Sequence, residues 1–393
     1  MNAGRGRRLL MIEQGGRGGV ADYTVDLVRA LAAQGWSITL ATAADHRYPP
    51  IDGVSPRPVF HYVRGDTAVG RALRERGLGR VVNGVRFLAA LPRLMRLAAQ
   101  ADIVHSQGWE IPQIGLPAVA CLRLTGTPVV HTEHGTFDRT SSFLRTRRLV
   151  RRLTGRLTAR TIVHTNADLA RVTPWLGARA VVIPHGEYGG LARSGGGAER
   201  GPARAALGLA PDAPATLMFG QLRTDKGLGD LVSALAQVPE LHLLIGGQDI
   251  GGLAEVRDRL EGPELKGRVT VREGFLDMAE AAELFAAADT VALPYREASQ
   301  SGVLLLAYGF GRPVVVYPSG GMVESVVDGQ TGWICSACDV DALAQALAAS
   351  VQAGPEECLR RGQRGQALAH ERFAWPVIAR RTGELYDEVL AGA

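Results

Sequence analysis

The residues best suited to chemistry on an anionic substrate are Arg223 and Lys226. They follow Gly220 and an expected strand, Ala215–Phe219, and they come just before an expected helix at 228–237. Cationic side chains at a helix N-terminus can stabilise a leaving group that gains negative charge as a bond breaks. An ordinary solvated loop is the alternative interpretation.

A glycine-rich loop near the start of the chain offers a second site of this kind. Gly16, Gly18 and Gly19 lie between an expected strand, residues 8–12, and an expected helix, residues 20–34. This arrangement lets the backbone approach a phosphate at a helix N-terminus, although a tight turn would also explain the glycines. The loop does not match the G-x-G-x-x-G fingerprint, which counts against a dehydrogenase.

The elements that must position these residues alternate between strand and helix. Residues 289–332 hold a buried strand, Thr290–Leu293, a helical segment from 303 to 308, a second strand from 313 to 317 and a glycine turn. In open α/β sheets, ligands bind where strand ends meet helix beginnings. This stretch has two such places in succession, so it is a candidate binding site.

A long ordered pattern in this stretch resembles the glycosyltransferases of family 4. The matching residues are Pro294, Tyr295, Gln300, Ser301, Gly302, Val303, Ala307, Tyr308, Gly311, Pro313, Gly320, Gly321 and Glu324. The resemblance implies an α/β protein of the GT-B fold, with two Rossmann-like doubly wound domains and an interdomain cleft. It also implies a retaining, metal-independent hexosyltransferase that needs no cofactor beyond its nucleotide-diphosphate sugar donor.

The resemblance assigns roles to individual residues. It implies a catalytic set with the basic pair on the donor diphosphate, a histidine beside the donor sugar and a candidate sugar contact: Arg223, Lys226, His134 and Glu297. It implies donor binding by the first-domain glycines and by second-domain residues that include backbone groups against the base: Gly16, Gly18, Gly19, Gly220, Phe275, Leu276, Gln300, Ser301, Gly302, Val303 and Glu324.

The chain departs from the family at a glutamate pair, in place of which it carries the Gln300–Val303 motif, Q-S-G-V. The expected positions of the two glutamates hold Ala298 and Leu306, and Glu297 lies one residue before the first. The ribose-binding role therefore has no residue assigned to it. The donor sugar, its nucleotide and the acceptor are all left open.

Length and composition agree with two domains. A chain of 393 residues exceeds what one core usually serves. We expect an N-terminal domain at 1–188, a glycine-rich linker at 189–203, a nucleotide-sugar domain at 204–372 and a C-terminal helix at 373–393 that crosses back to the first domain. Pro92 is expected to kink or divide a helix at 81–100.

The charge distribution points to an anionic partner. Residues 1–195 hold 27 Lys and Arg against 13 Asp and Glu, so 27 − 13 = +14, whereas residues 196–393 hold 17 against 26, so 17 − 26 = −9. Eight arginines lie at 139–160 with leucines repeating every four residues, which predicts a basic amphipathic helix. Such a helix contacts an anionic membrane or acceptor, or simply packs its leucines on a core.

The sequence predicts no metal site and no export signal. Cys335 and Cys338 lack a second ligand pair, and Asp339 and Asp341 precede a helix that they would cap. The apolar run after Arg8 is too short for a signal peptide, so we expect a cytoplasmic protein, peripheral at the inner membrane face if the basic helix binds there.

Together these features predict transfer of a sugar from a nucleotide-diphosphate donor to a hydroxyl acceptor such as a cell-surface glycan, a glycolipid or a secondary metabolite. A nucleotide-sugar epimerase or phosphorylase on the same fold is the nearest alternative. A basic nucleic-acid-binding protein is the other. Because Phe143 is the only aromatic residue at 139–160, base stacking has little support and we expect no nucleic-acid partner.

Overall fold

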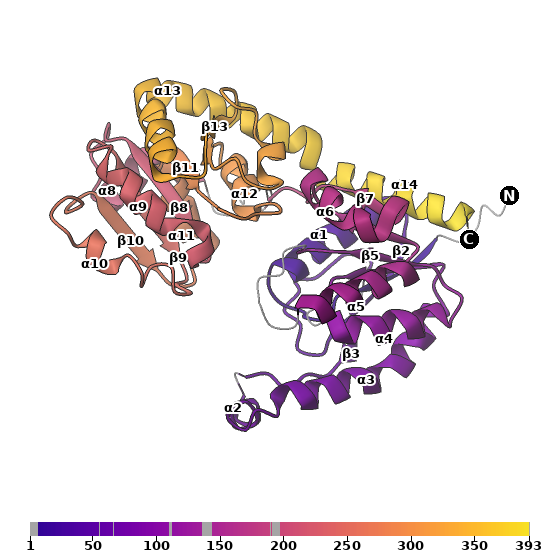
Figure 1. Ribbon diagram of the computed structural model, residues 1–393. Coiled ribbons are helices and arrows are strands. Elements are labelled where there is room, and N and C mark those ends of the chain that lie inside the picture. The colour runs from indigo at the N-terminus through magenta and orange to yellow at the C-terminus, as the bar shows by residue number, and fades with distance from the viewer. Residues whose placement is uncertain are drawn as a thin grey trace. The chain divides into compact units, whose positions relative to one another are not determined.

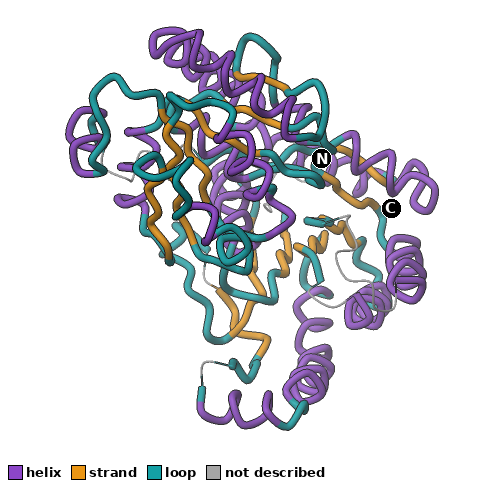
Figure 2. The backbone as a smooth tube through the Cα atoms, turned by 60° about the vertical axis from the view of Figure 1, so that its left-hand side comes forward, coloured by secondary structure: helices purple, strands orange, loops and turns teal. Residues whose placement is uncertain are grey.

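The structure is a computed structural model that describes residues 7–54, 56–65, 67–109, 112–135, 144–188, 190 and 197–392. The chain forms two compact units. Unit 1 comprises Met1–Gly186 and Trp375–Ala393, and unit 2 comprises Glu187–Ala374. In both units, strands lie between helices (Figures 1 and 2).

Unit 1 is built on a seven-stranded parallel sheet in the order β3-β2-β1-β4-β5-β6-β7. The strands are β1 (Arg8–Ile12), β2 (Ser37–Ala43), β3 (Pro56–Phe60), β4 (Ile103–Gln107), β5 (Val129–Thr132), β6 (Arg160–Val163) and β7 (Ala180–Val182). The direction of the strand order reverses between β1 and β4. The carboxyl ends of these two strands therefore form the topological switch point, where doubly wound folds bind ligands.

Two helical layers cover the sheet of unit 1, because alternate β1 residues point to opposite faces. Leu9 and Met11 join a core with α1 (Gly19–Ala33) and α14 (Trp375–Ala391). Leu10 and Ile12 join a core with α3 (Gly79–Ala98) and α4 (Pro112–Arg123). The remaining helices are α2 (Ala68–Glu75), α5 (Leu144–Leu157), α6 (Asn166–Leu176) and η1 (Gly177–Arg179).

Unit 2 has a six-stranded parallel sheet in the order β10-β9-β8-β11-β12-β13, and its switch point lies between β8 and β11. The strands are β8 (Ala215–Phe219), β9 (His242–Gly247), β10 (Val269–Glu273), β11 (Thr290–Leu293), β12 (Val314–Val316) and β13 (Gly332–Ile334). The helices are α8 (Arg200–Ala206), η2 (Thr224–Lys226), α9 (Leu228–Ala236), α10 (Arg257–Leu260), α11 (Met278–Ala287), α12 (Gly302–Gly309), η3 (Met322–Ser325) and α13 (Val340–Phe373).

Some segments differ from the sequence predictions. The expected division of the helix at Pro92 is wrong, because α3 runs through this proline as one helix. Pro92 is exposed, so water can reach the carbonyl group that its missing N–H leaves without a partner. Residues 200–203, predicted to be part of the linker, begin α8, while 189 and 191–196 lie outside the described residues. The Asp339 side chain accepts a hydrogen bond from Ala342 N, which confirms its capping role.

Candidate active site

The cationic pair of unit 2 lies at the switch point between β8 and β11. Arg223 immediately precedes η2 and Lys226 ends it, and Gly227 at φ 74° leads into α9. A Cβ on Gly227 would lie 2.1 Å from the Pro294 carbonyl oxygen, so this loop packs directly on the residue that follows β11. The sequence predicted the loop. Its contact with Pro294 depends on the order of strands in the sheet.

Neighbouring side chains hold both cations in place. Arg223 Nε and Nη2 donate to the two Asp225 carboxylate oxygens at 2.8 and 2.9 Å. These hydrogen bonds raise the pKa of Arg223. The Lys226 ammonium lies 3.6 Å from the centroid of the Tyr295 ring, a cation–π contact. Burial raises the pKa of Tyr295 to about 12, so this ring is a neutral phenol at physiological pH.

The predicted Q-S-G-V motif lies beside this loop. Ser301 caps α12 by accepting a hydrogen bond from Leu304 N at 3.3 Å. A Cβ on Gly220 would lie 3.2 Å from Val303 Cγ2, and one on Gly302 would lie 2.9 Å from the Tyr188 ring. The structure therefore brings Gly220, Lys226 and residues 301–303 together at one edge of the sheet. Gln300, half-buried, directly precedes the cap.

A third loop, after β12, contacts the loop after β11. Gly321 N donates to Ala298 O at 3.2 Å, and a Cβ on Gly320 would lie 1.8 Å from that oxygen. Glu324 follows in η3 and is half-buried. Glu297 is exposed to solvent beside the buried Ala298. Leu306, at the other position where the family has a glutamate, is buried in the apolar core of unit 2.

The ends of β9 and β10 also border this edge. Three neighbouring strands each end at or just before a glycine with positive φ, namely Gly220 at 107°, Gly247 at 139° and Gly274 at 134°. A Cβ on Gly247 would lie 1.8 Å from Gly220 O, so only glycine fits there. Sequence reasoning missed Gly247, although its position at the end of an apolar run was a signal. Phe275 is 91% exposed, whereas Leu276 packs against the core.

In unit 1, the glycine loop after β1 is organised by a buried carboxylate. Glu13 accepts hydrogen bonds from Gly15 N and Gly16 N, both at 2.7 Å, and another from the Tyr48 hydroxyl. These two loop amides are therefore bound within the protein. At Gly18, φ 82°, no side chain caps α1, so the first amides of this helix can still face an anion.

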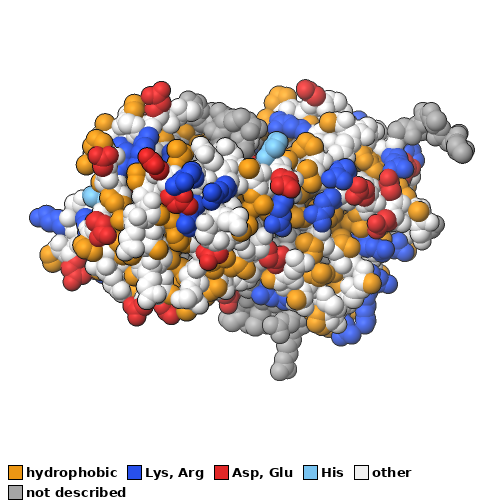
Figure 3. All heavy atoms as spheres, turned by 90° about the horizontal axis from the view of Figure 1, so that it is seen from above, with side chains coloured by type: hydrophobic (Ala, Val, Ile, Leu, Met, Phe, Trp, Pro, Cys, Tyr) orange, Lys and Arg blue, Asp and Glu red, His pale blue; other side chains and the backbone are white. Residues whose placement is uncertain are grey.

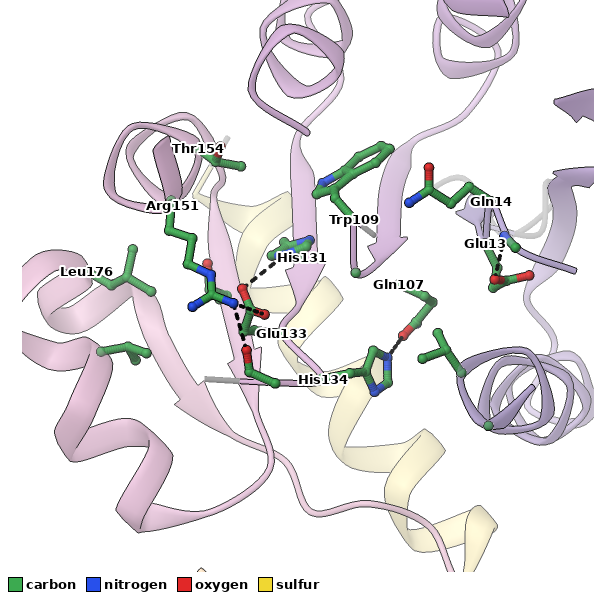
Figure 4. A pocket seen from close by; sticks show the side chains of 18 of the residues that line it. Glu13, Gln14, Gln107, Trp109, His131, Glu133, His134, Arg151, Thr154 and Leu176 are labelled. Atoms are coloured by element: carbon green, nitrogen blue, oxygen red, sulfur yellow. Dashed lines mark hydrogen bonds and ion pairs between the residues drawn. The ribbon is translucent and has the colours of Figure 1, made fainter. Parts of the chain in front are cut away.

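His134 follows β5 and belongs to a series of hydrogen bonds. Its Nε2 lies 3.0 Å from Gln107 Oε1 (Figure 4). Its Nδ1 lies 3.3 Å from His164 Nε2. His164 Nδ1 in turn lies 3.0 Å from the Ile183 carbonyl oxygen. Burial, followed by the nearby His164 and His185, holds the pKa of His134 well below its ordinary value, so the ring is neutral.

The acceptors at the ends of this hydrogen-bond series determine which ring nitrogens of His164 and His134 carry a proton. The Ile183 carbonyl can only accept, so Nδ1 of His164 carries a proton and Nε2 of its neutral ring accepts. His134 must then donate from Nδ1, which leaves Nε2 unprotonated toward Gln107. Every hydrogen bond in this series has one donor and one acceptor when the Gln107 amide turns its NH₂ group to His134. Both ring nitrogens are then engaged, and a bond from His134 to a sugar hydroxyl requires rearrangement of Gln107.

A cavity of about 360 Å³ opens beside His134 at the same edge of the unit 1 sheet (Figure 4). In its wall, Glu133 Oε2 lies 3.8 Å from His131 Nε2, and Glu133 Oε1 lies 3.7 Å from Arg151 Nη2. Arg151 Nη2 also donates to Gly135 O at 3.0 Å. Trp109 Nε1, buried, has no hydrogen-bond partner within the described part of the chain. The sequence did not identify Arg151 or Trp109 as cavity residues, because they come from different elements.

The described residues include no group of three or more His, Cys, Asp or Glu side chains arranged to hold a metal ion. Within the described ranges, no helix has both the length and the apolar character needed to cross a membrane.

Family models match both halves of the chain. The model described as Glycosyltransferase Family 4 matches residues 17–186, and the model described as Glycosyl transferases group 1 matches residues 213–353. The chain is a family 4 glycosyltransferase. This confirms the family, the two-domain Rossmann-like α/β fold and the enzyme class predicted from the sequence. The roles assigned to individual site residues stay predictions.

Individual relatives of this family 4 glycosyltransferase support the same assignment. D-inositol 3-phosphate glycosyltransferase of Actinosynnema mirum is 28% identical over 92% of this chain and 90% of its own. The same enzyme of Segniliparus rotundus is 29% identical over 96% and 86%.

Solved structures share the fold. Sucrose-phosphate synthase of Thermosynechococcus elongatus superposes with a TM-score of 0.78 at 22% identity, covering 98% of this chain and all of its own. HepE of Anabaena, solved in complex with UDP, has a TM-score of 0.73 at 19% identity, covering 97% and 100%.

Proposed function

We propose that this family 4 glycosyltransferase moves a hexose from a nucleotide diphosphate to a hydroxyl acceptor, with retention of anomeric configuration and without a metal ion. The observation that carries the proposal is the position of Arg223 and Lys226 at the β8–β11 switch point of unit 2, beside the Q-S-G-V loop. The nucleotide-sugar donor is also supported by HepE, whose solved complexes hold UDP and UDP-glucose.

The chemistry follows from the charge that develops on the donor. The bond between the anomeric carbon and the diphosphate oxygen breaks, and the diphosphate leaves with the electron pair. Arg223 and Lys226 stabilise that charge, a task for which a bound divalent cation would otherwise serve. The acceptor oxygen bonds to the anomeric carbon on the same face, and its proton passes to the departing phosphate oxygen. No side chain is needed as a general base.

The other site residues take supporting roles in the proposal. Within unit 1, the amides at the start of α1, at Gly18 and Gly19, offer hydrogen-bond donors to the phosphates of the donor, with Gly16 shaping the loop. Gln300, Ser301, Gly302, Val303 and Glu324 surround the donor in unit 2, together with Gly220 and the backbone at Phe275 and Leu276. His134 hydrogen-bonds to a hydroxyl of the donor sugar, and Glu297 provides an exposed carboxylate that accepts a hydrogen bond from a sugar hydroxyl.

The basic helix supports a peripheral location at an anionic membrane surface. On α5, Leu149 is 55% exposed and Leu153 is 36% exposed, and exposed Arg152 and Arg156 accompany them. These two leucines therefore do not serve the core, which was the alternative explanation. Residues 139–143 of the predicted helix lie outside the described residues. We propose that α5 contacts anionic lipid headgroups at the cytoplasmic face.

An acceptor-dependent assay separates the proposal from its alternatives. The purified chain is screened by thermal shift against nucleoside diphosphates and their sugars, and the stabilising donor is then incubated with and without candidate hydroxyl acceptors. We expect a glycosylated product only when an acceptor is present. A changed sugar nucleotide without any acceptor would instead indicate an epimerase, and stabilisation by no nucleotide would contradict the proposal.

A further inference from the structure

The α2–α3 hairpin, residues 68–98, carries an apolar surface that the fold does not use. Val81 and Val85 are each 62% exposed and Leu88 is 51% exposed. At 3.6 residues per turn, these three positions fall within an arc of roughly 60° on α3. The face that packs on the sheet is a different one, formed by Phe87, Leu91 and Leu94. We call Val81, Val85 and Leu88 the outer stripe.

The charge around the outer stripe has one sign. The hairpin contains seven arginines and a single acidic residue, Glu75. Exposed Arg96 borders the stripe at roughly 50° from its centre on the helix, whereas Arg93 and Arg86 lie farther round, at roughly 110° and 130°. None of the three forms an ion pair with a carboxylate among the described residues, and Arg86 donates instead to the His61 carbonyl at 2.9 Å. By contrast, acidic and basic side chains are interspersed on the face of the molecule shown in Figure 3.

The position of the hairpin leaves the stripe accessible within unit 1. α3 packs on α4 and α4 on α5, so the three helices form one layer on one face of the sheet (Figure 1). The outer faces of α3 and α5 are therefore presented on the same side of unit 1. A cavity of about 810 Å³ adjoins the start of α3, lined in part by Arg74, Arg80 and Asn83. It shares Gln14 with the cavity beside His134.

We propose that the α2–α3 hairpin docks on an anionic lipid bilayer, with the outer stripe inserted among the headgroups. An apolar stripe bordered by arginine matches such a surface. The apolar side chains bury at the boundary between headgroups and acyl chains, and the arginines are attracted to the anionic headgroups. A second copy of the chain is a poor occupant, since a two-fold interface at this hairpin would bring arginines against arginines. The inference adds a second contact to the one proposed for α5 and identifies α3 as the inserting helix.

Vesicle binding tests the inference. The full chain is sedimented with vesicles of phosphatidylcholine alone and of equal parts phosphatidylcholine and phosphatidylglycerol, at low and high salt. We expect binding only to the anionic vesicles, weakened by salt, and weakened about tenfold or more in the double variant Val85→Asp, Leu88→Asp. The gentler variant Val85→Ser, Leu88→Ser is expected to act in the same direction and guards against a folding defect.

Matched variants separate the alternatives. Leu359→Asp alters a similarly exposed leucine on helix α13 of unit 2 and is expected to bind vesicles as the unaltered chain does. Leu149→Asp measures the contribution of α5 separately. Unchanged vesicle binding by both outer-stripe variants would overturn the inference, as would a shift from dimer to monomer in those variants, which would identify a second copy as the occupant. Donor stabilisation in the thermal-shift screen is expected to be the same in all of them, so a failure here is distinct from a failure of the proposed transfer reaction.

Discussion

Replacing Gly227 by alanine should destabilise unit 2 far more than the same change two residues later. Gly227 has φ 74°, and an added Cβ would lie 2.1 Å from the Pro294 carbonyl oxygen. An L-residue in the left-handed region costs about 1–2 kcal/mol. Forcing the loop away from Pro294 adds roughly 1–3 kcal/mol. We therefore expect a loss of about 2–5 kcal/mol in the free energy of unfolding.

The matched control is Gly229→Ala. Gly229 lies in α9, and an added Cβ would meet nothing within 4 Å. Because alanine favours a helix over glycine, this variant should gain about 0.5 kcal/mol. Urea denaturation followed by circular dichroism measures the free energy of unfolding of both variants. A transfer assay should show lost activity in Gly227→Ala, because Lys226 would move with the loop. Equal unfolding midpoints for the two variants would refute the reasoning that the loop is fixed by its contact with Pro294.

Three further predictions concern the buried polar groups. Burial lowers the pKa of His185 to about 3. Below pH 6.5 this side chain is therefore protonated in the unfolded chain and neutral in the folded chain, so the free energy of unfolding falls as the pH falls. Between pH 7.5 and 5.0, His185→Asn should therefore lose about 2 kcal/mol less stability in urea titrations than the unaltered chain; an equal loss would contradict this. Long-range ¹H–¹⁵N spectra should show His134 protonated at Nδ1, with the proton moving to Nε2 in some molecules once His164→Ala removes the acceptor; an Nε2–H tautomer in the unaltered chain would refute the hydrogen-bond chain. Ser301→Ala should lower unit 2 stability by about 1 kcal/mol through loss of the α12 cap, and an unchanged midpoint would show that the cap contributes nothing.

Much of the fold could be predicted from local patterns. The strands at 8–12, 215–219 and 290–293 are short apolar runs bounded by turn residues, and the structure has all three at these positions. β3 and α2 were not predicted, because residues 45–70 combine prolines, glycines and charges with no clear period. Their positions depend on pairing with β2 and packing on α3, which no local pattern encodes.

The candidate site was predictable only where a local sequence pattern encodes it. The loop with Arg223 and Lys226 follows a strand and precedes a helix, so its place at the sheet edge follows from the sequence. The ring contact between Lys226 and Tyr295 joins residues 69 positions apart and depends on β8 lying next to β11. The ion pair of Arg151 with Glu133 likewise depends on how α5 crosses back over the sheet after β5.

The exposure of individual helix residues was the least predictable property. The leucine repeat in α5 fits a core-facing helix and a membrane-facing helix equally well. Only the packed structure shows Leu149 on the outside while Leu157 packs against the core of unit 1. The outer stripe of α3 was missed because valine and leucine in a helix are normally taken for core residues.

In the proposed reaction, Arg223 and Lys226 neutralise the diphosphate of the donor. Calorimetric titration with UDP, ADP and GDP tests this role of the two side chains. The titration compares the unaltered chain with the double variant Arg223→Gln, Lys226→Gln and with the surface control Arg257→Gln. Losing two charge-assisted contacts at about 1.5–3 kcal/mol each predicts that the double variant binds the preferred nucleotide at least ~100-fold more weakly, while Arg257→Gln binds it normally. Equal affinities for the double variant and the unaltered chain would contradict the account.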